Sequence, residues 1–328
     1  MFKPLTPQAL LGMAGALILM LILPFISTDP YLMHVMVLVM IFGIFASAWN
    51  LVTGFAGLKT FGHHAFFGLG AYGSALLSIH LGWSPWVTLW LGGLIAAAAG
   101  LLIGTPVLRI RSMPHVAIVT LAFAEIVRIC IANFGDLTRG EMGLWGIPQF
   151  DGFTLPIVGK VDFSPADKVS FYYLALALVV LVLFVIVRLM RSKTGLAMLA
   201  MRDGENAAES LGVNLTRMKL MVFALSAFIV GVAGAFYAHY LSILTPTSAV
   251  GVDLMISIIA MVLVGGLGTF SGPIVGALVL TILIEALRDL ENYRLLSYGI
   301  LIVLIIMFLP KGLVTIGERL FPRPQEQN

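Results

Sequence analysis

Residues 169–219 read VSFYYLALALVVLVLFVIVRLMRSKTGLAMLAMRDGENAAESLGVNLTRMK, an apolar run followed by a polar one. The apolar part, residues 169–187, is close to the roughly 20 residues that a helix needs to cross the hydrocarbon layer of a membrane. The polar part, residues 188–219, interrupts a chain that is otherwise almost continuously hydrophobic. This alternation predicts a membrane-spanning helix followed by a segment that is displayed to water.

The composition of the whole chain agrees with a membrane location. Apolar residues make up 60% of the 328 residues, charged residues make up 11%, and the mean hydropathy is +1.04. Such a chain cannot cover a water-facing surface with polar groups. Irregular backbone cannot face lipid, because its N–H and C=O groups would lose their hydrogen bonds. The expected fold class is therefore all-α, a polytopic transmembrane helix bundle that forms one domain over residues 1–328.

Charge and cysteine content exclude other classes of protein. The formal net charge is +3, and the basic residues are scattered over the predicted loops, so no nucleic-acid partner is expected. Cys130 is the only cysteine and lies inside an apolar stretch. A disulfide framework and a cysteine-based metal site are therefore excluded.

Apolar runs of sufficient length predict about ten spans, and eight to ten are possible because several runs are short. The candidate spans are Leu10–Ile26, Tyr31–Leu51, Ala65–Leu81, Trp86–Leu108, Val116–Asn133, Val169–Val187, Leu220–Tyr240, Leu254–Leu267, Pro273–Leu287 and Leu295–Leu309. We expect the first span to be retained, because the residues after it lack the small-x-small pattern of a signal-peptidase site.

The distribution of lysine and arginine predicts the orientation, because these residues accumulate in short cytoplasmic loops. With both termini inside the cell, most of the 19 basic residues lie in the cytoplasm, and the opposite orientation would invert the bias. Residues 188–219 are then a cytoplasmic loop. Residues 134–168 are a periplasmic loop, which is either a docking site for a receptor or an ordinary solvated connection.

The cytoplasmic loop carries the local signals of a short helix over residues 204–211. Asp203 is suited to cap its first turn, and Glu205 lies near its positive N-terminal end. Gly212 is suited to the left-handed conformation that ends a helix, and Asn214 can cap the next span.

Three small apolar residues fall on one face of this predicted helix. Leu211 follows Ala208 by three residues and Ala207 by four, so their side chains are neighbours. Together they would form an apolar knob suited to a groove on a partner protein. The alternative is a solvated connector that merely joins two spans.

Charged residues inside the predicted spans need partners or a wet cavity, because a charge at the bilayer centre costs roughly 2.5–3.5 kcal/mol. Glu125 and Arg128 are three residues apart and are expected to form an ion pair facing the bundle interior. This pair either fastens helices together or takes part in gating. His63 and His64 could line a polar break, and their adjacent rings diverge on a helix, so no metal site is expected.

Residues 57–61 read GLKTF and residues 266–270 read GLGTF, so both have a Gly-Leu-x-Thr-Phe pattern. Both segments lie at a predicted cytoplasmic break before a shortened helix. The match indicates either chance or an internal duplication with broken helices, the architecture in which transporters place their pathway.

Enzymatic machinery is not evident in the sequence. There is no Gly-x-x-x-x-Gly-Lys-Ser/Thr phosphate loop, so the chain is not expected to hydrolyse ATP. No Ser/His/Asp or His-Glu-x-x-His arrangement stands out either. The chain is therefore predicted not to be an enzyme, with no catalytic residue and no cofactor of its own.

A series of motifs carries a resemblance to a known family. Residues 206–212, NAAESLG, resemble the coupling loop of bacterial ABC importer permeases, although Asn206 stands where that pattern has glutamate. The other motifs are GFAG at 54–57, GHHAFFGLGAY at 62–72, AIVTLAFAEI at 117–126, GLWGIP at 143–148, GGLGTFSGP at 265–273 and LPKGL at 309–313. In order and spacing, from about residue 31 to 313, they are similar to the LivM-type permeases of bacterial branched-chain amino acid ABC transporters, within the LivHM family.

The resemblance implies a permease subunit of an importer in the bacterial inner membrane, with branched-chain amino acids as substrates. It implies three kinds of partner: a second homologous permease, two cytoplasmic ATPase subunits that bind the ATP, and a periplasmic binding protein. The alternatives are a permease of the same family for urea, amides or aromatic acids, and an ion-coupled secondary transporter.

Two groups of candidate site residues follow. The residues expected to contact the ATPase subunits are Arg202, Gly204, Glu205, Ala207, Ala208, Glu209, Leu211 and Gly212. The candidate residues of the translocation path or its gate are His63, His64, Thr120, Glu125 and Arg128.

Overall fold

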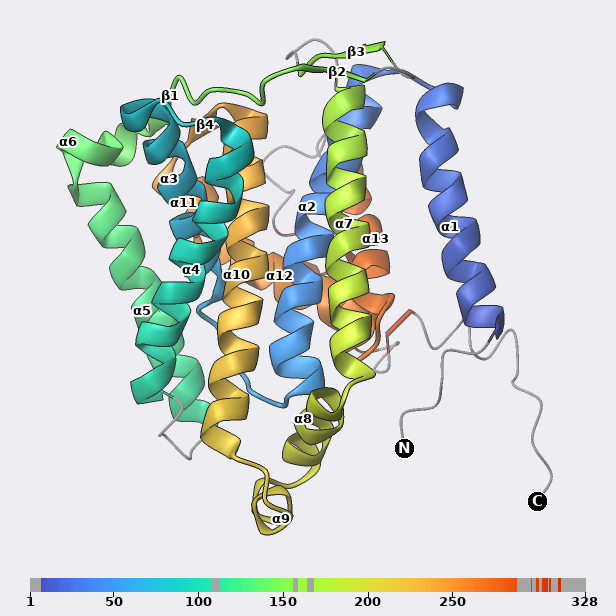
Figure 1. Ribbon diagram of the computed structural model, residues 1–328, viewed down its shortest axis with the longest axis vertical. Coiled ribbons are helices and arrows are strands. Elements are labelled where there is room, and N and C mark those ends of the chain that lie inside the picture. The colour runs from blue at the N-terminus through green and yellow to red at the C-terminus, as the bar shows by residue number, and fades with distance from the viewer. Residues whose placement is uncertain are drawn as a thin grey trace.

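The computed structural model describes residues 7–107, 113–155, 159–163 and 168–287, together with residues 296, 299–300, 303–305, 307 and 312–313. Most of these residues are helical, and Figure 1 shows the long helices as a bundle. The long helices are α1 (Pro7–Ile26), α2 (Pro30–Asn50), α3 (His63–Leu81), α4 (Pro85–Val107), α5 (Met113–Asn133), α7 (Val169–Met190), α10 (Leu215–Leu241), α12 (Val252–Gly265) and α13 (Gly272–Ala286). The predicted all-α membrane bundle is confirmed.

Short elements join the long helices. The helical ones are η1, a π-helical turn (Leu51–Phe55), α6 (Gly135–Thr138), η2, a 3-10 turn (Gly140–Met142), α8 (Lys193–Asp203), α9 (Glu205–Ser210) and α11 (Pro246–Val250). The strands form two antiparallel pairs, β1 (Leu144–Trp145) with β4 (Ile243–Leu244) and β2 (Phe153–Leu155) with β3 (Gly159–Val161). The strands and α6 lie at one end of the bundle, the strand end, and α9 lies beyond the other, the α9 end (Figure 1).

Nine of the ten predicted spans coincide with long helices, and the tenth, 295–309, lies largely outside the described residues. Within the described part of the chain, six helical stretches are long and apolar enough to cross a membrane. They are Pro30–Phe55, Pro85–Val107, Pro114–Asn133, Val169–Met190, Leu215–Leu241 and Pro246–Gly265. α7 continues past its predicted span to Met190, and α10 begins ahead of its predicted span, at Leu215. A helix can continue into water past the apolar run that defines its span.

Small residues let α10 pack closely on its neighbours. α10 makes its most extensive contacts with α4 and α3, and α3 and α4 also pack on each other. Gly70 of α3 lies so near Gly231 of α10 that a Cβ atom at Gly70 would overlap the Gly231 carbonyl oxygen. Close backbone approach of this kind holds helices together where lipid provides no hydrophobic drive for association.

Two breaks interrupt the helices at the α9 end. α2 continues into η1, and an irregular stretch, residues 56–62, precedes α3. A second irregular stretch, residues 266–271, separates α12 from α13. The predicted breaks around both Gly-Leu-x-Thr-Phe segments are therefore confirmed, and the duplication that would relate them stays a prediction.

The segment between α5 and α7 packs onto the strand end of the bundle instead of forming an ordinary solvated connection. Its buried apolar side chains include Leu144, Ile147, Phe150 and Phe163. The Phe150 ring centroid lies 5.4 Å from that of His239 on α10, and His239 Nδ1 lies 2.7 Å from the Pro148 carbonyl oxygen. These contacts fix residues 148–150 over the end of α10.

The close approach of α3 and α10 leads to a stability prediction. Gly70→Ala places a methyl group against the backbone of Gly231, which cannot move aside as a flexible side chain can. We therefore expect the free energy of unfolding to fall by about 1–3 kcal/mol. Thermal unfolding of the detergent-solubilised chain measures it. Gly15→Ala on α1 is the matched control, because a Cβ atom there has no neighbour within 4 Å. Equal unfolding temperatures for the two variants would contradict this packing.

Candidate functional site

The predicted coupling loop folds as two short helices, α8 and α9, between α7 and α10. Ser192 caps α8, its hydroxyl accepting a hydrogen bond from the Gly195 N–H at 3.4 Å. Asp203 is the last residue of α8, and Gly204 precedes the first turn of α9. The predicted capping role of Asp203 is therefore wrong, because the extra helix places it in the preceding element.

The predicted end of the short helix is confirmed. Gly212 has a φ of +82°, which L side chains rarely adopt, and its N–H donates to the Glu209 carbonyl at 2.9 Å. The Val213 N–H donates to the Ala208 carbonyl at 3.1 Å, closing the turn. Asn214 then caps α10, its side-chain oxygen accepting from the Arg217 N–H at 3.0 Å.

The exposed surface of α9 differs from the predicted apolar knob. Ala208 is only 1% exposed, because it faces the rest of the chain, and so it is not available to a partner. Ala207 and Glu209 are exposed, and the Leu211 side chain is 81% exposed. The surface that a partner can contact therefore has two apolar side chains, Ala207 and Leu211, beside acidic and polar groups such as Glu209.

An ion pair ties α9 to the first turns of α10. Lys219 Nζ lies 2.6 Å from Glu205 Oε1, and the Lys219 side chain is only 10% exposed. Because Glu205 begins α9 and Lys219 follows the turn at Gly212, the pair closes the loop across its base. Partial burial strengthens this contact relative to a surface ion pair.

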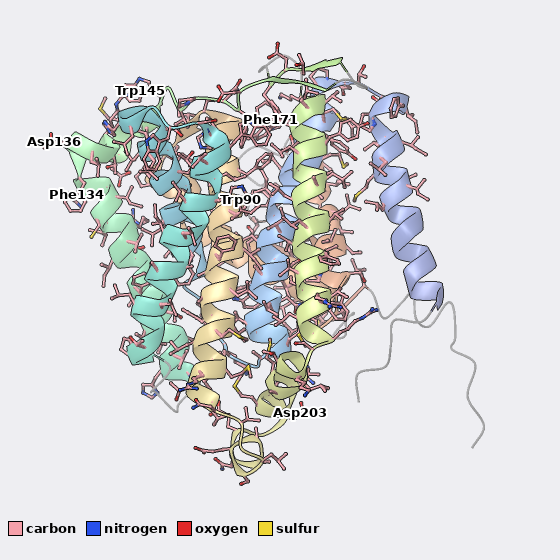
Figure 2. The ribbon with its side chains drawn as sticks, viewed as in Figure 1. Trp90, Phe134, Asp136, Trp145, Phe171 and Asp203 are labelled. Atoms are coloured by element: carbon pink, nitrogen blue, oxygen red, sulfur yellow. The ribbon has the colours of Figure 1, made fainter. Side chains whose placement is uncertain are left out.

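Arg202 connects the same loop to the first break. Its Nη1 group donates to the Gly54 carbonyl at 3.2 Å, and its Nε group lies 3.1 Å from Asp203 Oδ1. Figure 2 shows Asp203 at the end of α8 nearest α9. The guanidinium group thus bridges η1 and the point where α8 gives way to α9.

Asn50 joins the first break to the second. Its side-chain oxygen accepts from the Gly268 N–H at 2.8 Å, and its side-chain NH₂ donates to the Thr269 carbonyl at 2.8 Å. The rings of Phe55 and Phe270 pack alongside, with centroids 5.2 Å apart. We call Asn50, Gly54, Arg202, Gly268 and Thr269 the joint.

The joint places α9 in a continuous series of contacts with both helix breaks. Two residues, Asp203 and Gly204, separate Arg202 from the first residue of α9, and Arg202 contacts the break that Asn50 ties to the other. Asn50 was not predicted as a site residue. Its signal in the sequence is an amide inside an apolar span, a group that needs partners there.

His63, His64 and Thr120 lie together where the first break meets α5. The Phe61 N–H donates to the Thr120 hydroxyl at 3.0 Å. His63 is fully buried, with its ring nitrogens 2.8 Å from the Thr60 hydroxyl and 3.0 Å from the Ser226 hydroxyl. His64 is also buried, and neither of its ring nitrogens has a hydrogen-bond partner among the described residues.

The predicted ion pair on α5 forms, but not in the interior of this chain. Arg128 Nε lies 2.9 Å from Glu125 Oε1, and the two side chains retain 27% and 39% exposure. Arg128 Nη1 also lies 3.8 Å from Glu141 of η2. The pair lies in the half of α5 nearer the strand end and ties that helix to the external segment, so the predicted interior position is wrong.

Comparisons with known proteins identify the family. The chain matches the family described as branched-chain amino acid transport system / permease component over residues 31–309. The high-affinity branched-chain amino acid transport system permease proteins LivM of Salmonella typhimurium and Escherichia coli are each 39% identical to it, covering 84% of this chain and 68% of theirs. The corresponding LivH protein of Escherichia coli is 23% identical, covering 83% of this chain and 91% of its own. No solved structure matches the chain.

The matched residues include both breaks, the whole joint and α9. The relatives are permease proteins of transport systems and not enzymes, and several helices of this chain are able to span a membrane. The chain belongs to the family of permease components of the branched-chain amino acid transport system.

Proposed function

We propose that this chain is a membrane permease subunit of an ABC importer that carries branched-chain amino acids into the cytoplasm. The observation that carries the proposal is α9, a short helix beyond the bundle that is connected through Arg202 to the first helix break and from there through Asn50 to the second. The partner subunits hydrolyse the ATP, and the energy reaches this chain through their contact with α9.

The proposal includes the rest of the assembly. A second, homologous permease completes the membrane part, since this chain is similar to both LivM and LivH. Two ATPase subunits serve the pair of permeases from the cytoplasm and contact the exposed surface of α9 in this chain, which includes Ala207, Glu209 and Leu211. A periplasmic binding protein delivers the substrate. The chain lies in the inner membrane with both termini in the cytoplasm, so residues 134–168 are periplasmic and residues 188–219 form the coupling loop.

The mechanical step follows from the contacts of α9. A push on its exposed surface is resisted by the Glu205–Lys219 pair, so α9 and the start of α10 move together. Arg202 carries the same displacement to Gly54, and Asn50 carries it to Gly268. The two breaks therefore respond as one unit, and the bundle changes between outward-open and inward-open states.

The gate is proposed to lie near the first break. Thr120 holds the backbone of this break at Phe61, and His64 places an unpaired polar ring beside it. A shift of the break would move these groups relative to α5, which carries Glu125 and Arg128. Few charged groups are needed along such a path, because the substrate side chains are apolar.

Gradient-driven uptake separates this function from an ion-coupled transporter. Vesicles that contain only this chain are given a proton or sodium gradient, and uptake of labelled leucine is followed. We expect no uptake until the second permease, the ATPase subunits, the binding protein and ATP are supplied. Uptake driven by a gradient alone would rule out the proposal that the chain is a subunit of an ABC importer.

Cysteine cross-linking tests the contact with the ATPase subunits. In a Cys130→Ser background, Leu211→Cys places a thiol on an 81% exposed side chain of the loop. We expect it to cross-link to an ATPase subunit in cells. Ala208→Cys, at a position that is only 1% exposed, is the matched control and should remain unlinked. Absence of an ATPase adduct at position 211 would contradict the docking role.

The turn at Gly212 gives a second test of coupling. Gly212→Val forces a β-branched residue into a left-handed conformation that costs an L-residue about 1–2 kcal/mol, so the native turn becomes about 5–30 times less populated. We expect uptake per ATP hydrolysed to fall while membrane insertion is unchanged. Gly212→Asn should behave almost as the wild type, because asparagine tolerates this conformation. Unchanged transport by the valine variant would count against the role of this turn.

Arg202→Met tests whether the joint transmits motion. The variant loses the hydrogen bond to Gly54, and since Arg202 is 39% exposed we expect uptake per ATP to fall by about tenfold at most. Cross-linking through Leu211→Cys should persist, because docking does not need this bond. Arg191→Met, an exposed arginine at the end of α7, is the control. Loss of the cross-link together with uptake would place Arg202 in the docking contact instead.

A further inference from the structure

A cavity of about 370 Å³ lies at the strand end, where α2, α7 and α10 meet the external segment. Small-molecule sites in proteins have volumes of about 300–1,000 Å³, so this one is of a size for a single small ligand. Figure 2 shows Phe171, one of its lining residues, at the strand end of α7. The cavity lies at the opposite end of the bundle from the joint and α9.

One wall of the cavity is apolar and held in place. Phe171 and Tyr240 pack edge to face with their ring centroids 5.1 Å apart, and Leu241 follows Tyr240 on the same wall. The Tyr240 hydroxyl lies 2.6 Å from His34 Nδ1, and these two rings also stack. Rings fixed in this way form a preformed surface for an apolar side chain.

The other groups of the cavity are polar and include a cation. Lys168 contributes a positive charge from the residue that precedes α7. Ser242 ends α10 in a left-handed conformation, with a φ of 59°, and β4 begins at the next residue. Its Oγ atom is buried and has no hydrogen-bond partner among the described residues. A strained residue with an unsatisfied hydroxyl is typical of a ligand site.

Gln149 completes the cavity from the external segment. Its neighbours on both sides are anchored, since the Pro148 carbonyl lies 2.7 Å from His239 Nδ1 and the Phe150 ring packs against the rings of Phe171 and Phe236. The amide of Gln149 is therefore positioned by backbone that the bundle holds. The cavity has the rigid supports that a specific site needs.

We propose that this cavity is a periplasmic-side binding site for the free α-amino acid before it enters the translocation path. Lys168 and the Ser242 hydroxyl bind the carboxylate, and the side-chain oxygen of Gln149 accepts from the ammonium group. The branched side chain lies against Phe171 and Leu241. This inference rests on the proposed function and deepens it, because it gives the permease its own recognition of an amino acid.

Photoaffinity labelling tests the site in the assembled transporter in proteoliposomes. A diazirine analogue of leucine is delivered by the binding protein, irradiated and mapped by peptide mass spectrometry. We expect label on the peptides that carry Phe171 or Leu241, suppressed by excess leucine but not by isopentylamine, which lacks the carboxylate. Lys168→Gln should weaken capture by about tenfold or more, because a hydrogen bond to a charged group is lost.

Matched variants separate recognition from folding. Lys168→Arg keeps the charge and should retain most of the capture, and Lys160→Gln removes the other lysine of the external segment and should have no effect. Ser242→Gly removes the hydroxyl and allows the same φ, so it should weaken capture without unfolding the chain.

Four outcomes would overturn the proposal. Label outside the cavity, or equal capture by Lys168→Gln and the wild type, contradicts this site alone. Weaker attachment of the binding protein to Lys168→Gln, with unchanged capture, would assign the cavity to docking an acidic side chain of that protein. Failure of the wild type to capture the leucine analogue anywhere would overturn the proposed function as well.

Discussion

The structure depends on one constraint: backbone that leaves a helix within a membrane bundle must find hydrogen bonds inside the protein. The two breaks meet this requirement by facing each other. Asn50 satisfies an N–H and a carbonyl of the second break, and the Trp49 indole N–H donates to the Thr60 carbonyl of the first at 2.8 Å. Because lipid cannot replace these bonds, the two hydrogen bonds of the Asn50 side chain hold the breaks together.

Hydropathy predicts most of the fold, because each span is decided locally by about 20 residues. The contacts that make the joint are not local: the Asn50 amide and Gly268 are 218 residues apart in sequence, so no short pattern pairs them. The absence of long-range contacts from local patterns also explains two wrong predictions, the exposure of Ala208 and the direction in which the ion pair on α5 faces. Ala208 and Leu211 share a helical face in projection, and tertiary packing buries one of them. Glu125 and Arg128 pair as their spacing predicts, but spacing does not say which way α5 faces. Gly212 and Asn214 were predictable because helix ends follow local rules.

A six-residue helix has little stability of its own, since helix nucleation is unfavourable and short helices are marginal in water. α9 must therefore owe its position to its anchors: the Gly212 turn, the Glu205–Lys219 pair and the buried side chain of Ala208. All three connect it to the bundle. The helix bundle therefore resists a force applied at Leu211. A flexible connector in the same place would give way to that force.

The same two helices serve both ends of the molecule. α2 carries His34 near the strand end and Asn50 at the joint, and its 21 residues span about 30 Å. α10 carries Lys219 near α9 and Tyr240 at the cavity. A helix resists bending over this length, so a tilt imposed at the joint must appear as a displacement at the other end. The His34–Tyr240 contact joins α2 to α10 there, and relative motion of the two helices would alter the wall of the cavity. Substrate contact at one end and ATPase contact at the other would then bias the same pair of helices, which is the physical requirement for coupling between distant sites.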